Sequence, residues 1–344
     1  MAKKIDVSDD NGVTWYTLPG GTGEYAEEAE SITDTVFGNT YESSEIGLIS
    51  WTVSANAYYK GFAGYNAKVL KPGTSTAVLG EAMSLVSGKT YQVTAAARRV
   101  MDRSQTITVY DNAVAVADSN IQSFDYLFGK VTFVASYTVT GPVTMDFNYF
   151  PMTSIGTSSS FTLTQTANPI DTTDFATAQG NTGFRTFTPG LRTVSMDLSG
   201  FFNVSNAFKS ALESRSEVII EVNPDGNGNS IARGFFKPAT WGQSGDVGAL
   251  EEETITYNLN IPDDAKMALG FSWEHTSGTT LSTAVQKILT AWLNESMIDV
   301  RYLYDGTSGY RGKAMMSDVT LEGSLDGMNL FTANFQGSGQ PSAV

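Results

Sequence analysis

The sequence predicts a mainly β protein, and three observations support this prediction. Of the 344 residues, 33 are glycine and 10 are proline, and only 17% are charged. This composition is typical of many short strands joined by turns. Apolar residues alternate with polar ones in several segments, and these segments recur in two internal repeats. The chain is long enough for two domains, each with its own core.

The first repeat pairs Asn206 to Asn260 with Ala284 to Gln336. Each copy begins with apolar residues at three- and four-residue spacing, which predicts a short amphipathic helix. In the later copy this helix follows Ser282-Thr283, a typical N-terminal cap. Each helix is followed by an alternating segment, 217–222 in the first copy and 297–302 in the second, which predicts a strand.

Turn residues extend the first repeat. Each predicted strand leads to an Asp-Gly pair, Asp225-Gly226 or Asp305-Gly306, which favours the positive φ of tight turns. Each turn is followed by an Arg-Gly pair, at Arg233 or Arg311, and then by a further strand. The order helix, strand, turn, strand, strand is therefore present twice.

The second repeat pairs Gly47 to Ala55 with Gly190 to Leu198, each a strand of period two that opens with Gly-Leu. Long loops precede both strands, Phe37 to Ile46 and Phe175 to Pro189. Their aromatic side chains would be exposed on an isolated chain, so contacts between subunits are expected there. The residues assigned to these contacts are Phe37, Tyr41, Glu45, Phe184, Arg185 and Phe187.

The repeats divide the chain into three parts. Domain A is discontinuous, with residues 1–65 and 265–344, and domain B covers 153–264. Residues 66–152 form a small inserted β module, with strands expected near 91–93, 107–110, 131–133 and 145–147. The linker Thr153 to Ser160, rich in Ser and Thr, marks the boundary. A plain tandem arrangement with exchanged segments remains an alternative. The predicted fold class is two β-sandwich or barrel domains, each flanked by one short helix, plus the inserted module.

Composition also excludes several classes of function. The net charge of −15 disfavours sequence-specific nucleic-acid binding, because such a surface repels phosphate. The chain has no cysteine, so disulfides, thiolate metal sites and cysteine nucleophiles are excluded. One histidine, His275, cannot supply a multi-histidine metal site. No signal peptide and no membrane-spanning apolar run is recognisable.

The remaining motifs favour structure over chemistry. Gly88-Lys89-Thr90 lacks the earlier glycine of a phosphate-binding loop, and Asp225 to Asn229 lacks the glycine and glutamate of an EF-hand. The acidic runs Glu251 to Glu253 and Asp263-Asp264 are typical of solvated strand ends. No nucleophile elbow accompanies His275. We therefore expect no catalytic residue, no cofactor and no metal.

The chain contains a duplicated set of elements in a fixed order: long loop, Gly-Leu strand, short helix, Asp-Gly turn and closing strand, the last ending in Phe335 to Gly339. This set resembles the major tail tube proteins of long-tailed, non-contractile bacteriophages. The resemblance covers about 28–65 and 153–342. It implies tail-tube-like β-sandwich domains that assemble as stacked rings around the path of the genome, with the two long loops in contacts between subunits or successive rings. Duplicated members of the family are expected to form trimeric rings of pseudo-hexameric shape, with a hexamer of chains as the open alternative.

The resemblance also implies partners and a location. A tape measure protein and a tail terminator are the expected partners, DNA passes without specific binding, and no membrane insertion is expected. The protein would be assembled in the host bacterial cytoplasm and reside in the virion tail. The polar faces of the two duplicated strands are the candidates for the bore: Ser50, Thr52, Ser54, Thr193, Ser195 and Asp197. Another β-rich surface, adhesion or carbohydrate-binding protein is the alternative.

Overall fold

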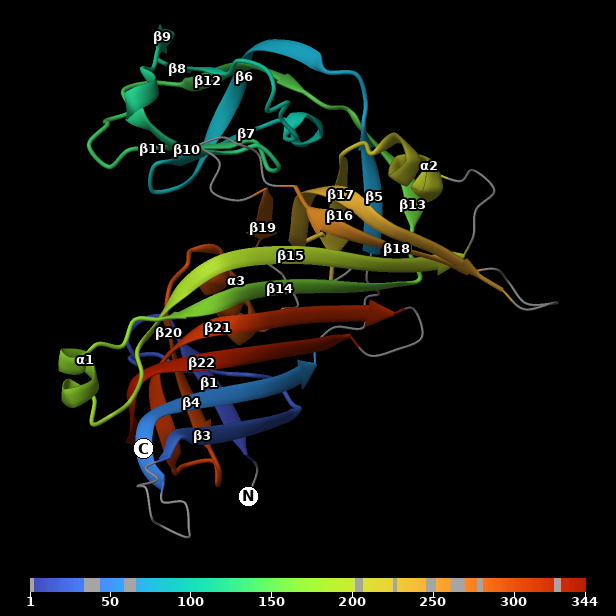
Figure 1. Ribbon diagram of the computed structural model, residues 1–344. Coiled ribbons are helices and arrows are strands. Elements are labelled where there is room, and N and C mark those ends of the chain that lie inside the picture. Colours follow the sequence, from blue (N-terminus) through green and yellow to red (C-terminus); the bar gives the residue numbers. More distant parts are fainter. Residues whose placement is uncertain are drawn as a thin grey trace. The chain divides into compact units, whose positions relative to one another are not determined.

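A computed structural model describes residues 3–33, 44–58, 66–201, 207–224, 228–245, 252–260, 270–276, 281–324 and 329–344 (Figure 1). The protein is mainly β, as the sequence predicts. Its contacts define two compact units. Unit 1 comprises 1–64, 161–196 and 278–344, and unit 2 comprises 65–160 and 197–277.

Unit 1 is built around long antiparallel strands. Strand β21 lies between β20 and β22, β4 follows β22, and β3 follows β4. Strands β1 and β2 extend the sheet beyond β20, and β14 lies beside β21. The elements with residues in this unit are β1 (Lys4–Ser8), β2 (Tyr16–Thr17), β3 (Thr22–Thr33), β4 (Ser44–Tyr58), β14 (Ser160–Asp171), α1 (Phe175–Gly180), β15 (Phe187–Phe201), α3 (Thr283–Leu293), β20 (Ile298–Leu303), β21 (Gly309–Ser324) and β22 (Leu330–Ala343).

Helix α3 covers the core of unit 1 and confirms the predicted amphipathic pattern. Ser282 caps the helix, because its hydroxyl accepts a hydrogen bond from the backbone N–H of Val285. The helix contacts β1, β2 and β21. Its apolar face is buried through Ala284, Val285, Ile288, Leu289, Ala291 and Trp292.

Unit 2 contains two sheets. In the first, β16 lies between β5 and β17, β13 pairs with β5, and both β18 and β19 pair with β17. Its elements are β5 (Asn66–Pro72), β13 (Met152–Thr157), α2 (Ala207–Ser214), β16 (Val218–Asn223), β17 (Ser230–Ser244), β18 (Glu252–Leu259) and β19 (Phe271–His275).

The second sheet of unit 2 is formed by the inserted segment, and the strands expected there are all present. They run in the order β10-β11-β7-β6-β12-β8-β9 (Figure 1). Their bounds are β6 (Thr76–Ser87), β7 (Thr90–Val93), β8 (Thr108–Asp111), β9 (Val114–Ala115), β10 (Ile121–Asp125), β11 (Lys130–Phe133) and β12 (Val143–Tyr149), with short 3-10 helices η1 (Ala96–Arg98) and η2 (Asp118–Asn120). A buried core that includes Phe128, Phe133 and Met145 fills the module.

The strand registers show that the first repeat is a structural duplication. Phe236 of β17 pairs with the first residue of β16, and Ala314 of β21 pairs with the first residue of β20. A β-bulge then follows at the same distance in both strands, at 238–240 in β17 and at 316–318 in β21. Because bulges fix the register and bend of a strand, agreement at this level reflects one architecture used twice.

The duplication extends to the sheet order. One copy has the order β2-β1-β20-β21-β22-β4-β3, and the other has β13-β5-β16-β17-β18-β15-β14. Strand β5 thus occupies in the second copy the position that β1 occupies in the first. The inserted module connects β5 to β13, as residues 9–15 connect β1 to β2.

The boundaries expected from the sequence differ from this arrangement in two respects. Residues 66–72, expected in the inserted module, pair with β16 as strand β5. Residues 153–264, expected as one domain, are divided between the units, with 161–196 in unit 1. The expected linker 153–160 contains strand β13, and the expected loop 175–189 contains helix α1 and the start of β15.

The Asp305-Gly306 turn shows the expected positive φ, with Gly306 at 88°. Asp305 accepts backbone hydrogen bonds from Thr307 and Ser308, and these lower the pKa of its carboxyl to about 2. Asp225-Gly226 lies outside the described residues.

We expect Asp305→Ala to lower the melting temperature of the protein at pH 7. The pKa of Asp305 is lower in the folded than in the unfolded chain, so its stabilisation is present above about pH 4 and is lost as the pH falls through about 2. The difference between wild type and variant should therefore shrink as the pH approaches 2 and disappear below it, as measured by thermal unfolding across pH. A difference that is constant with pH would contradict this assignment.

Candidate functional site

A polar face with several carboxylates covers one side of the sheet in unit 1. Trp51, Val53 and Ala55 of β4 are buried, so Ser50, Thr52 and Ser54 lie on the opposite face. The antiparallel registers place further polar side chains beside them on β3, β22 and β21. These are Thr22, Glu24, Glu28, Asn56, Thr332, Asn334, Gln336, Asp318, Thr320 and Glu322. None of the side chains named is basic.

The charge of this face is concentrated on β3 and β21. Glu24 and Glu28 are exposed, whereas Asp318 is only partly exposed. Burial raises the pKa of Asp318, although a hydrogen bond from the Thr320 hydroxyl at 3.2 Å opposes the rise. A surface of Ser, Thr, Asn, Glu and Asp repels phosphate and offers it few donors.

The corresponding strand β15 shows the same alternation. Val194, Met196 and Leu198 are buried, and the candidate bore residues Thr193, Ser195 and Asp197 lie on the other face. The Thr193 and Thr166 hydroxyls are 2.6 Å apart, and the carboxylate of Asp197 accepts a hydrogen bond of 2.6 Å from Thr256. The predicted polar faces of both strands are therefore present, and their place in a bore stays a prediction.

Three of the six residues assigned to contacts between subunits instead make contacts within one chain. Phe184 is 8% exposed and forms a bridge to Ile49 of β4. Arg185 makes ion pairs with Glu30 at 2.8 Å and Asp171 at 2.7 Å. The backbone N–H of Phe187 donates to the hydroxyl of Ser338 in β22.

Phe184 is thus not an exposed aromatic side chain, contrary to the expectation, because it is buried within the single chain. Glu45 is exposed and lies opposite Ile32 in the β3–β4 pair. Phe37 and Tyr41 lie outside the described residues. A role of these six residues in contacts between subunits stays a prediction.

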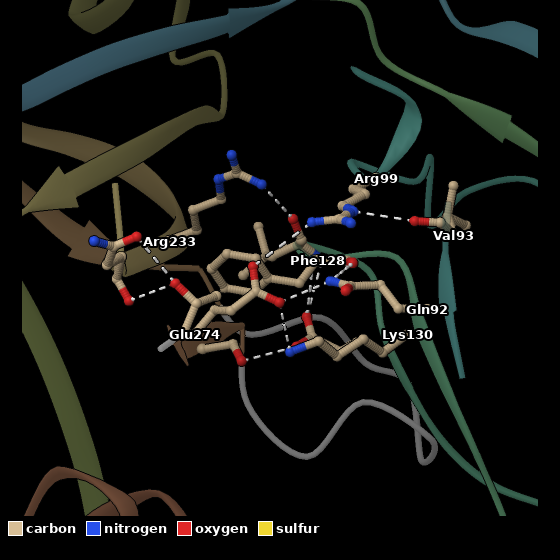
Figure 2. Close-up of polar contacts among 12 residues, drawn as sticks. Gln92, Val93, Arg99, Phe128, Lys130, Arg233 and Glu274 are labelled. Carbon is tan, nitrogen blue, oxygen red and sulfur yellow. Dashed lines mark hydrogen bonds and ion pairs between the residues drawn. The ribbon is translucent and has the colours of Figure 1, made fainter. Parts of the chain in front are cut away.

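Within unit 2, a polar cluster attaches the inserted module to strands β17 and β19 (Figure 2). Glu274 of β19 accepts a hydrogen bond of 2.7 Å from Gln92 and forms an ion pair of 3.0 Å with Lys130, both on the module. Arg99 lies 3.9 Å from the same carboxylate. Burial opposes the charge of Glu274, but Lys130, Gln92 and Arg99 outweigh it and lower the pKa.

The cluster continues around Phe128, which is fully buried. The guanidinium of Arg233 in β17 lies 4.9 Å from the ring centroid and donates to the backbone oxygen of Leu127 at 3.0 Å. Arg233 also pairs with Glu221 of β16 at 2.8 Å. Ser272 of β19 donates to Asp125 of the module at 2.8 Å. These contacts hold the module against the first sheet of unit 2 with defined geometry.

We expect Glu274→Gln to destabilise unit 2 by about 1–3 kcal/mol, because the charges of Lys130 and Arg99 lose their shared partner. The exposed pair Lys209–Glu213 on α2 supplies the control, and Glu213→Gln should cost less than about 1 kcal/mol. Denaturant unfolding measures both values. Because the pKa of Glu274 is lowered on folding, its contribution should be lost as the pH falls through that lowered value. Equal effects of the two substitutions would contradict this role for the cluster.

Within the described ranges, no three His, Asp or Glu side chains gather in a way that could hold a metal ion. His275 lies at the end of β19, its ring stacks on Trp273, and its Nδ1 is 3.0 Å from the Ser230 hydroxyl. A cavity of about 560 Å³ in unit 1 is lined by residues that include Lys3, Lys4 and Tyr302, and its lining contains no carboxylate.

No family model and no curated protein matches the chain. Among the described residues, no helix is long and apolar enough to cross a membrane. The functional inference therefore rests on the duplicated sheet, its polar face and its strand edges.

Proposed function

We propose that this chain is a structural subunit that polymerises as stacked rings into the tail tube of a long-tailed, non-contractile bacteriophage. The observation that carries the proposal is the way in which the two copies of the sheet are joined. Strand β14, which begins the second copy, lies beside β21 of the first, so sheet continues from one copy into the next. A repeat that joins to itself edge to edge is suited to ring formation.

Two further observations support a conduit for DNA. The polar face of β3, β4, β21 and β22 carries Glu24, Glu28, Asp318 and Glu322, and the whole chain has a net charge of −15. A wall of this kind would let DNA slide, whereas a basic wall would retain it. Closing the sheets into a barrel would also remove the exposed edges that otherwise invite aggregation.

Because each chain supplies two copies, three chains would give a ring of roughly six-fold shape. The proposal extends to the tape measure protein and tail terminator as partners, to assembly in the bacterial cytoplasm and to location in the virion. It includes no enzymatic activity and no cofactor. The alternative, an adhesion or carbohydrate-binding protein, would use an open cleft with aromatic platforms.

Negative-stain electron microscopy of the purified protein tests the proposal. We expect rings or tubes with a central channel, and their formation should increase with protein concentration. Particles that remain single chains at all concentrations, together with specific glycan binding, would instead support the alternative.

A further inference from the structure

We propose that neighbouring chains join head to tail, with β3 of one copy pairing along residues 238–244 of β17 in the next. The inference rests on the proposed ring and names the two strand edges that form it. It follows from the duplication, because the join between the two copies inside one chain is a template for the join between chains.

The internal join is formed by β14 and the second half of β21. Residues 309–314 of β21 pair with β20 on one edge, and β14 continues beside β21 in the same sheet. Phe161 of β14 lies against Gly323, where a Cβ atom would approach the ring to 2.4 Å. In this join Phe161, Leu163 and Gln165 are all at most 2% exposed.

Within the described residues, the equivalent strands outside this join have no strand partner on the corresponding edge, although helix α2 contacts β17 and Lys209 lies over the ring of Trp241. Strand β3 corresponds to β14, and within the described ranges it pairs only with β4. Residues 238–244 of β17 correspond to 316–322 of β21. They pair with β18 on one edge, and β16 pairs only with residues 232–236 of β17.

Side chains of β14 in the internal join are more buried than the equivalent side chains of β3. Thr193 of β15 and Ser50 of β4 occupy equivalent positions in the second repeat. Thr166 of β14 lies beside Thr193, and Glu28 of β3 lies opposite Ser50. The residues that precede them, Gln165 of β14 and Glu27 of β3, are therefore also equivalent. Gln165 is fully buried, whereas Glu27 and Ala29 are exposed.

The same contrast appears on the other strand. Met315, Val319 and Leu321 of β21 are buried. Their equivalents in β17 are Lys237, Trp241 and Gln243, of which Lys237 and Gln243 are exposed and Trp241 is partly exposed. Among the described strands, the two edges without a strand partner are therefore equivalent to the two edges that pair inside the chain. Each chain carries one edge of each type. This arrangement gives a heterologous contact, which forms a closed ring where the rotation between neighbours closes and an open filament where it does not.

Blocking one edge at a time tests this pairing. Backbone N–H groups of successive residues in a strand point to opposite edges. Of Glu27→Pro and Glu28→Pro, one therefore removes a bond to β4 and the other removes only a donor on the outer edge. Of these two β3 variants, the one that keeps the wild-type melting temperature has lost only the donor on the outer edge. We call it the edge-blocked variant. Gly242→Pro and Gln243→Pro give the corresponding pair for β17.

Each edge-blocked variant alone should remain a single chain in analytical ultracentrifugation. An equimolar mixture of the two should form a species of twice the mass of one chain and nothing larger, because only one intact β3 edge and one intact β17 edge remain in each pair. Dimers of the β17-blocked variant alone would indicate β3 pairing with β3 and would overturn the proposal.

The outcome separates this inference from the proposed function. If wild type forms rings but the mixture forms no dimer, the pairing of β3 with β17 is overturned and the tube function stands. If the mixture dimerises but wild type forms open chains instead of rings, the pairing is retained and the tube function is contradicted.

Discussion

Replacing Trp51 by alanine is expected to destabilise unit 1 by about 3–5 kcal/mol, the usual cost of removing a large aromatic side chain from a core. Trp51 is 1% exposed, and its indole N–H donates to the backbone oxygen of Gly339 at 2.8 Å. Its ring lies against Gly312 and Gly337, where added Cβ atoms would approach to 2.5 and 1.9 Å. The side chain thus determines how β4 packs on β21 and β22. Since small domains have only about 5–15 kcal/mol of stability, ring assembly should fail as well.

Denaturant unfolding measures this effect. Trp15→Ala is the matched control, because Trp15 is only partly buried and contacts Arg301 through its ring face. It should cost less than about 2 kcal/mol. Gly337→Ala should destabilise by about 1–3 kcal/mol through overpacking against Trp51. Gly180→Ala, in open space on α1, should have little effect. Similar values for Trp51 and Trp15 would contradict the assigned packing.

The second large effect concerns the acidic face. We expect the double substitution Glu24→Lys and Glu28→Lys to leave folding intact, because both side chains are exposed. The substitution should convert a surface that repels DNA into one that retains it. Tubes of the variant should bind double-stranded DNA at low salt. Each added phosphate contact should steepen the fall of log affinity with log salt by about 0.9.

Binding of short duplex DNA to assembled tubes over a range of salt concentrations measures this effect. Glu213 and Asp118 are exposed acids on α2 and η2, and replacing both by Lys gives the same change in net charge away from this face. That control should bind DNA much less. Equal binding by the two double variants would show that total charge, and not this face, sets the affinity for DNA.

Local sequence patterns predict much of the fold. Helix α3 could be predicted because Ser282 and the apolar residues after it form a complete local signal. The polar faces of β4 and β15 could be predicted because one side of each strand is buried, so the side chains alternate. The repeat could be found because both copies keep the same turn residues.

Elements without a local sequence pattern could not be predicted from the sequence. Strand β3 shows no alternation beyond Tyr25, since residues 26–33 are exposed on both faces. Strand β5 pairs with β16, about 150 residues away, and nothing in its own sequence indicates that partner. The contact between Gln92 and Glu274 spans 182 residues and joins two polar side chains, neither of which belongs to a recognisable motif. Only the folded sheet brings such pairs together.

A cryo-electron microscopy map of the assembled particle tests the central claim most directly. We expect rings of three chains with roughly six-fold shape, stacked into a tube whose bore is lined by the polar faces that carry Ser50, Thr52, Ser54, Thr193, Ser195 and Asp197. Six complete chains in each ring would contradict the trimer, and a bore lined mainly by Lys and Arg would contradict the proposed passage of DNA.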